Sequence, residues 1–180
     1  MVSMEQKRMM IVLYGGMSQG KTSTLMQLAI NLAGGGPVVT SSIHSTFIRK
    51  GKYWDGHLII VYKGHLIYIA TGGDSWEVCS GNTEFFENEF YNLTIYQVDA
   101  TGVMKMSAAD KRKYNKQKPD VVISACRPNG DRYGAIKALH AYSEQALSNY
   151  TEQQWIRKQK TDDNNAKAKD IQDRIDEFIK

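Results

Sequence analysis

Eight consecutive residues near the start of the chain combine glycines, a lysine and a threonine at the spacing GxxxxGK[ST]. They are Gly15, Gly16, Met17, Ser18, Gln19, Gly20, Lys21 and Thr22. Glycines let the backbone curl so that successive N–H groups converge, and side chains at these positions would block the approach of a ligand. The lysine adds a positive charge, and a hydroxyl oxygen can bind a hard cation. These residue types at this spacing predict a site for phosphate groups and Mg²⁺.

The segments on both sides of this motif are those that a phosphate-binding loop requires. Residues 9–14 form a continuous apolar run, which is typical of a strand that is covered on both faces. From Lys21 onward the apolar residues fall at helical spacing, at Leu25, Leu28, Ala29 and Leu32. A helix that begins here directs its N-terminal N–H groups and positive dipole end toward the loop. The sequence therefore predicts a strand, a glycine loop and a helix in direct succession.

In this context, residues 9–32 resemble the P-loop NTPase superfamily, and the eight-residue motif is similar to its Walker A motif. The resemblance covers about the first fifth of the chain and indicates a superfamily, with no specific family. It implies that Lys21 contacts the β- and γ-phosphates and that Thr22 binds Mg²⁺. ATP is then the expected substrate or ligand, and Mg²⁺ the expected cofactor. The expected nucleotide-binding residues are Gly15, Gly16, Met17, Ser18, Gln19, Gly20, Lys21, Thr22 and Ser23.

P-loop enzymes also carry an acidic residue at the end of a neighbouring strand, where it holds the water shell of the metal. No uninterrupted apolar run of this chain ends directly in aspartate. Asp74 follows the strand predicted at residues 66–69, after a short glycine-rich turn. Asp99 follows the strand predicted at residues 93–98, which contains the polar Gln97. We expect Asp74 to take the metal-binding and catalytic role, with Asp99 as the alternative.

Basic residues elsewhere could stabilise charge on a transferred phosphoryl group. Arg127 and Arg132 follow the apolar run of residues 121–126, and we take Arg127 as a catalytic candidate, with a surface turn as the alternative. Residues 111–118 contain five cations. Such a run forms a lid in small nucleotide kinases, and a solvated loop is the simpler interpretation. Nucleic-acid binding is not favoured, because the single aromatic Tyr114 makes no stacking platform.

Two partial motifs bear on the choice of nucleotide. The predicted hairpin and the turn after it resemble the segment of Ras-like GTPases that senses the γ-phosphate, but Ala70 stands at the position of its aspartate. Guanine-specific members also carry an Asn-Lys-x-Asp element after a strand. The nearest match, residues 115–118, ends in lysine and precedes a predicted strand. ATP is therefore preferred over GTP.

The remaining pattern predicts an α/β protein with the three-layer α/β/α fold of P-loop NTPases. Its sheet is expected to be mainly parallel, with one antiparallel hairpin strand, because residues 58–62 and 66–69 flank a short turn. We divide the chain into a nucleotide-binding domain, residues 1–150, and a polar, helical C-terminal extension, residues 151–180. Residues 161–165 are expected to join two helices, the second of which carries an apolar stripe at Ile171, Ile175, Phe178 and Ile179.

The composition excludes several classes of protein. With 42% hydrophobic and 23% charged residues, the chain of 180 residues has ordinary globular values. Its net charge of +4 favours anionic ligands but is too small to indicate nucleic-acid binding. No apolar run reaches the roughly 20 residues that span a bilayer, and residues 1–10 are too charged for a secretory signal. We therefore expect a cytoplasmic protein without a membrane partner. The spacing of Cys79 and Cys126 supports neither a zinc site nor a disulfide framework.

Three functions are consistent with these features. The leading interpretation is an ATP-binding P-loop NTPase in which Lys21, Thr22, Asp74 and Mg²⁺ place the γ-phosphate for attack by water. The first alternative is a small-molecule or nucleotide kinase, in which residues 41–55 or the basic run close over an acceptor. The second alternative is a non-catalytic nucleotide-sensing or assembly module. In that case the C-terminal helix contacts a protein partner or a second copy of the chain.

Overall fold

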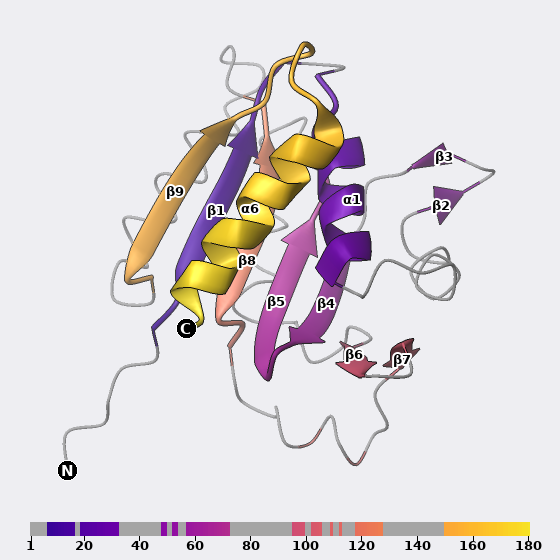
Figure 1. Cartoon of the computed structure of the whole chain (residues 1–180), viewed down its shortest axis with the longest axis vertical. Helices are drawn as coiled ribbons and strands as arrows, with labels where there is room; N and C mark the ends of the chain where they lie inside the picture. The colour runs from indigo at the N-terminus through magenta and orange to yellow at the C-terminus, as the bar shows by residue number, and fades with distance from the viewer. Residues whose placement is uncertain are drawn as a thin grey trace.

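The computed structural model contains one large sheet with helices packed against it (Figure 1). The residues that the structure describes are 7–16, 19–32, 48–49, 52–53, 57–72, 95–99, 102–105, 109, 112, 118–127 and 150–180. In chain order, the elements assigned within these ranges are β1 (Met9–Tyr14), α1 (Lys21–Leu32), β2 (Ile48–Arg49), β3 (Lys52–Tyr53), β4 (His57–Tyr62), β5 (His65–Ala70), β6 (Ile95–Asp99), β7 (Gly102–Lys105), β8 (Val121–Cys126), β9 (Glu152–Arg157) and α6 (Asn164–Phe178).

Among the described strands, seven form a mixed sheet in the order β7-β6-β4-β5-β8-β1-β9. The strands β5, β8, β1 and β9 run parallel to one another. β4 is antiparallel to β5, β6 is parallel to β4, and β7 is antiparallel to β6. The prediction of an α/β protein with a mainly parallel sheet and an antiparallel hairpin is confirmed. The second antiparallel pair, β6 with β7, was not predicted.

The strands in the middle of the sheet are those with uninterrupted apolar sequence. All six residues of β8 are buried, as are the first five residues of β1, which lies beside it. A strand that is covered on both faces gains from apolar side chains on both, which explains these runs. β9 has the polar sequence EQQWIR, and only Ile156 of it is buried. It pairs with β1 on one side and is the last strand of the sheet in the described order.

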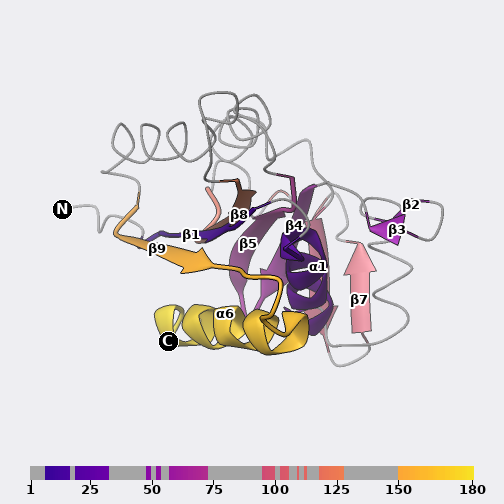
Figure 2. The same ribbon diagram turned by 90° about the horizontal axis from the view of Figure 1, so that it is seen from above.

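Helices α1 and α6 lie side by side on one face of the sheet (Figure 2). The predicted apolar positions of α1 are buried, namely Leu25, Leu28, Ala29 and Leu32. Ala168, Ile171 and Ile175 of α6 are fully buried in the same core. Both helices of the described ranges lie on this one face, and residues 128–149 lie outside the described part of the chain. The three-layer arrangement therefore stays a prediction.

The C-terminal segment is built into the same sheet and core as the N-terminal part. Residues 152–157 belong to the extension that was expected to be helical, but they form β9, which pairs in parallel with β1 from Met9↔Glu152 to Tyr14↔Arg157. The first of the two expected helices falls before this strand, mostly outside the described part of the chain. The pairing is non-local, so the polar sequence of this edge strand carried little local signal. The second helix was predicted correctly as α6, but its apolar stripe faces the protein's own core. No helix in the described ranges has the length and apolar character needed to cross a membrane.

Candidate functional site

The predicted phosphate-binding motif lies in the connection between β1 and α1. Gly15 and Gly16 follow the last residue of β1, and Gln19 and Gly20 precede the first residue of α1. Met17 and Ser18 lie outside the described residues. The order of strand, loop and helix is the one expected from the sequence. The first turn of α1 contains no acidic residue, so no carboxylate competes with an anionic ligand at the helix N-terminus.

Glycine is required at both ends of this loop for different physical reasons. A Cβ atom on Gly15 would lie 2.3 Å from the backbone oxygen of Lys158, which is far too close for any side chain. Gly15 also donates its N–H to the oxygen of Cys126, at 3.1 Å, which fixes the loop against the end of β8. Gly20 has a φ of +84°, where L side chains are disfavoured, and its Cβ would lie 2.6 Å from Asn164 Oδ1.

Lys21 lies across the start of the loop. Its ammonium donates hydrogen bonds to the carbonyl oxygens of Gly15, at 2.8 Å, and Gly16, at 2.7 Å. The residue is 7% exposed, although its charge favours water. These contacts place a positive charge beside the backbone that would receive phosphate groups.

Thr22 lies next to the end of β5. Its hydroxyl is 3.5 Å from the carbonyl oxygen of Thr71, the residue that follows β5. Asp74, the expected metal-binding acid, comes three residues after Thr71 and lies outside the described part of the chain. Because β5 runs parallel to β8 and β8 to β1, the chain leaves β5 at the same edge of the sheet as the β1–α1 loop. The topology therefore brings Thr71 to the edge of the sheet that carries the loop.

The same topology excludes Asp99 from this site. Asp99 ends β6, which runs parallel to β4, and β4 is antiparallel to β5. The carboxyl end of β6 is thus at the opposite edge of the sheet from the carboxyl end of β1. The direction of β6 is set by its pairing with β4, which the sequence does not show. The sequence alone therefore could not reject Asp99 as the metal-binding acid.

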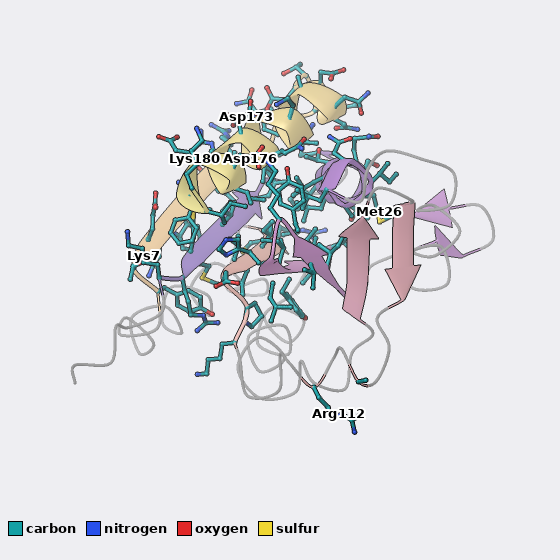
Figure 3. The ribbon with its side chains drawn as sticks, turned by 60° about the horizontal axis from the view of Figure 1, so that its bottom comes forward. Lys7, Met26, Arg112, Asp173, Asp176 and Lys180 are labelled. Carbon is teal, nitrogen blue, oxygen red and sulfur yellow. The ribbon has the colours of Figure 1, made fainter. Side chains whose placement is uncertain are left out.

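Arg127 follows β8 directly and is 9% exposed. Tyr14 and Cys126 are paired in the register of β1 and β8, so Arg127 leaves the sheet beside Gly15. The structure thus brings Arg127 to the edge of the sheet that carries the loop. Arg132 lies outside the described residues, and of the basic run only Arg112 and Lys118 are described. Arg112 lies well away from Met26 of α1 (Figure 3).

A cleft of about 370 Å³ opens beside the loop. Residues from two distant parts of the sequence form it, because β9 lies next to β1 in the sheet. Its walls combine an aromatic ring, two amide side chains and basic residues. The lining residues are Tyr14, Gly15, Gly16, Gln19, Arg157, Lys158 and Gln159.

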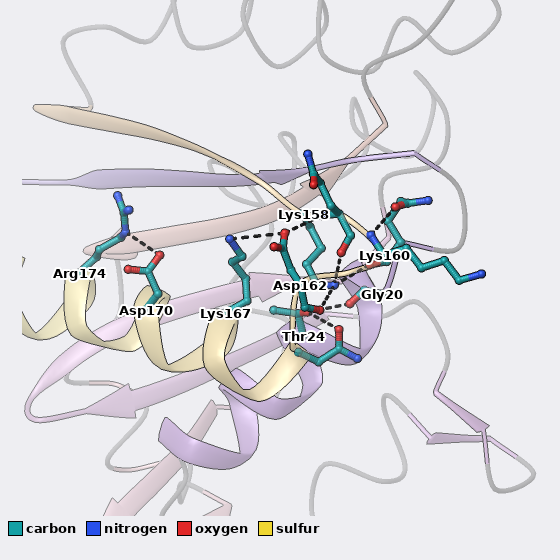
Figure 4. A network of polar contacts seen from close by, with 11 residues as sticks. Gly20, Thr24, Lys158, Lys160, Asp162, Lys167, Asp170 and Arg174 are labelled. Carbon is teal, nitrogen blue, oxygen red and sulfur yellow. Dashed lines mark hydrogen bonds and ion pairs between the residues drawn. The ribbon is translucent and has the colours of Figure 1, made fainter.

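The turn between β9 and α6 contacts the loop through several polar groups (Figure 4). The Lys158 ammonium donates to the Gln19 carbonyl at 2.8 Å, and Gln19 Oε1 accepts from the Lys160 N–H at 2.5 Å. The Thr24 hydroxyl lies 2.8 Å from the Gly20 oxygen and 3.3 Å from Asn164 Oδ1. Sequence reasoning missed the residues of the turn, because the stretch RKQK at residues 157–160 resembles an ordinary exposed segment and carries no local motif.

Burial and charge oppose each other at Lys158. The pKa of its ammonium lies below its ordinary value, chiefly because of burial, with a further lowering by the charge of Lys167, while the carboxylates of Asp162 and Asp163 act in the opposite direction. The pKa of Asp162 lies below its ordinary value, chiefly because its carboxylate accepts a hydrogen bond from the Gln159 N–H.

In the described ranges, no group of three or more His, Cys, Asp and Glu side chains could hold a metal ion. Comparisons of this chain with protein-family models, with curated proteins and with solved structures find no match. The chemistry of the site therefore rests on its residues alone. The arrangement offers backbone N–H groups at a helix N-terminus, the charge of Lys21 and a neighbouring polar cleft, a combination suited to a ligand with several negative charges.

Proposed function

We propose that this protein is a P-loop NTPase that binds ATP with Mg²⁺ at residues 15–23 and hydrolyses it. The observation that carries the proposal is the conformation of the β1–α1 connection. The full GxxxxGK[ST] sequence lies between a buried strand and a helix N-terminus, with Lys21 hydrogen-bonded to the carbonyls of Gly15 and Gly16.

The loop fits a chain of phosphates. Gly15 and Gly20 stand where a Cβ would collide with an oxygen of Lys158 or Asn164, so the two glycines let the segment after β9 approach the loop closely. Thr22 is the second residue of α1 and lies beside the end of β5, and its hydroxyl is a suitable ligand for Mg²⁺. A bound Mg²⁺ would supply positive charge that offsets the charge of the β- and γ-phosphate oxygens. Thr22 and Asp74 are the residues that we propose to hold it.

The chain's own residues have separate tasks in this proposal. The N–H groups of the loop and of the first turn of α1 bind the phosphates. Lys21 stabilises negative charge between the β- and γ-phosphates, because its ammonium lies at the start of the loop. Arg127, which leaves β8 beside Gly15, is proposed to stabilise charge on the transferred phosphoryl group. Asp74 is proposed to orient the water shell of the metal.

The cleft beside the loop is the proposed place for the nucleoside. It shares Gly15, Gly16 and Gln19 with the loop, so a ligand can extend from the loop into it. Gln19 and Gln159 provide amide groups that can donate to and accept from the edge of a base, and Tyr14 provides an aromatic ring. Arg157 adds a positive charge at the cleft. The absence of an Asn-Lys-x-Asp element favours ATP over GTP.

The test is a measurement of Mg²⁺-ATP and Mg²⁺-GTP binding and of phosphate release, alone and with a panel of nucleoside monophosphates. Lys21→Ala should weaken binding by about 100-fold, since charged hydrogen bonds to two phosphates are lost. Lys169→Ala is the matched control, because Lys169 is exposed, pairs with Asp173 on α6 and contacts no residue of the site. Wild-type ATP affinity in Lys21→Ala would exclude the proposal.

The same assay separates the three functions. Phosphate release that needs no acceptor and is lost in Lys21→Ala supports an NTPase. Phosphate transfer that rises only with an added acceptor supports a kinase. Tight binding with neither reaction supports a nucleotide sensor. The burial of Ile171 and Ile175 in the protein's own core removes the main reason for an assembly surface on α6.

A further inference from the structure

Lys158 is buried although it lies in a polar turn between β9 and α6, and only 2% of the residue is exposed. Its ammonium donates to three backbone carbonyls, those of Gln19 at 2.8 Å, Gln159 at 2.7 Å and Asp162 at 2.9 Å. An ammonium has three N–H donors, so these acceptors use all of them. We propose that Lys158 is a positioning residue that holds the β1–α1 loop in its phosphate-binding conformation. This inference rests on the proposed function.

The contact with Gln19 orients one peptide unit of the loop. In a trans peptide, the carbonyl of one residue and the N–H of the next point in opposite directions. The described residues contain no cis peptide bond. Because the Gln19 carbonyl faces the Lys158 ammonium, the Gly20 N–H faces the other way. The Gly20 N–H is one of the donors proposed for the phosphates, so its direction depends on Lys158.

The backbone of Lys158 also contacts the beginning of the loop. Its N–H donates to the oxygen of Tyr14 at 2.7 Å. Its own carbonyl oxygen lies 2.3 Å from the position of a Cβ on Gly15, so the two backbones are in close contact. One residue therefore touches the loop where the chain leaves β1 and again where it enters α1. The distance between these two ends is set in part by Lys158.

The turn that carries Lys158 has its own supporting contacts. The carboxylate of Asp162 accepts from the Gln159 N–H at 2.8 Å and lies 3.7 Å from the Lys167 ammonium. Asp163 caps α6 by accepting from the Ala166 N–H at 2.8 Å. These contacts keep the carbonyls of Gln159 and Asp162 in place as acceptors. The carbonyls of Gln159 and Asp162 thus hold the Lys158 ammonium in place, and the ammonium in turn holds the Gln19 carbonyl of the loop.

Two substitutions of Lys158 test the proposal. Lys158→Met keeps the length and removes the donors, whereas Lys158→Arg keeps the charge and the donors. We expect Lys158→Met to weaken Mg²⁺-ATP binding by about 10-fold or more, as for the loss of a charged hydrogen bond, and Lys158→Arg to retain more of the affinity. Inorganic tripolyphosphate with Mg²⁺ has no base, so its affinity reports on the loop alone. In Lys158→Met this affinity should fall by the same factor as that for ATP. A loss for ATP alone would assign Lys158 to the cleft and overturn the inference.

Lys63→Met is the matched control. The Lys63 ammonium donates a hydrogen bond to the carboxylate of Asp176 on α6. This contact lies near the C-terminal end of α6, far from the loop (Figure 1). Lys63→Met should leave both affinities unchanged. Wild-type affinity in folded Lys158→Met overturns the inference while leaving the proposed function intact. If Lys158→Met does not fold, Asp162→Ala, which loosens the turn, should still weaken tripolyphosphate binding, and an unchanged affinity there overturns it. Failure of the wild type to bind ATP removes the proposed function and this inference together.

Discussion

The two ends of α6 are attached to the protein in different ways. Near its N-terminal end, the buried Lys158 of the preceding turn contacts the β1–α1 loop, and the half-buried Asn164 contacts Thr24 of α1. At its C-terminal end, Asp176 accepts from Tyr62 at 2.9 Å and from Lys63 at 2.8 Å, and the Lys63 side chain is 59% exposed. Both ends use charged hydrogen bonds, but only the first involves backbone that we propose to bind a ligand.

This difference indicates what each end contributes. Exposed ion pairs are screened by water and stabilise proteins little. A buried ammonium must have its donors satisfied, and its removal leaves carbonyls without partners, so it has a stronger influence on local conformation. We therefore expect the N-terminal end of α6 to affect ligand binding and the C-terminal end to affect only stability.

The largest expected loss of stability concerns the middle of α6, because its packing holds both ends of the helix in place. Ile171→Ala removes a fully buried side chain from the core shared with α1, and it should lower the free energy of unfolding by about 2–5 kcal/mol. Denaturant titration followed by circular dichroism measures this loss. Ala substitution of the partly buried Ile179 should cost clearly less, and equal losses would contradict the packing described for α6.

The next effect distinguishes the two glycines at the start of the loop. Gly15→Ala places a Cβ against the Lys158 carbonyl oxygen and should destabilise the protein by about 1–3 kcal/mol. In Gly16→Ala, the nearest atom to the new Cβ is Gln19 Cγ, at 3.7 Å, which is an ordinary contact. This control should unfold at nearly the wild-type denaturant concentration. Equal free energies of unfolding of the two variants would refute the close contact between Gly15 and the Lys158 backbone.

A smaller effect concerns the N-cap of α6. Asp163→Ala removes the hydrogen bond to the Ala166 N–H and should lower the free energy of unfolding by about 1 kcal/mol. The cap holds the turn of Lys158, so ATP binding should weaken as well. Asp173→Ala, on the exposed face of the same helix, serves as the control and should leave binding unchanged. Thermal unfolding and titration with Mg²⁺-ATP measure the two quantities.

The smallest effect is expected at the C-terminal end of α6 and depends on pH. Burial alone would raise the pKa of Asp176, but the hydrogen bonds from Lys63 and Tyr62 outweigh it and hold the pKa below its ordinary value of 3.8. The stabilisation is therefore fully present above that pH and is lost as the pH falls through the lower pKa of the folded state. The difference in unfolding temperature between wild type and Asp176→Asn should shrink on acidification. A difference that grows toward low pH would contradict this assignment.

The local pattern of the sequence was sufficient for the central elements. β1, α1, the β4–β5 hairpin and β8 follow from apolar runs, helical spacing and a short turn, which depend only on residues close together in the chain. The turn is a tight one, with positive φ at Lys63 and Gly64. The position of the glycine loop between β1 and α1 also follows from the local pattern. The roles of Lys21 and Thr22 stay predictions.

The features that the sequence did not reveal all depend on contacts between distant residues. β9 is a strand because it pairs with β1, although its own sequence is polar. Lys158 is buried because its acceptors include a carbonyl 139 positions away in the chain. Asp99 is excluded because β6 runs in the direction set by its pairing with β4. Local propensity indicates which segments form strands and helices. The direction, neighbours and burial of these elements follow from long-range pairing and packing, which no local pattern encodes.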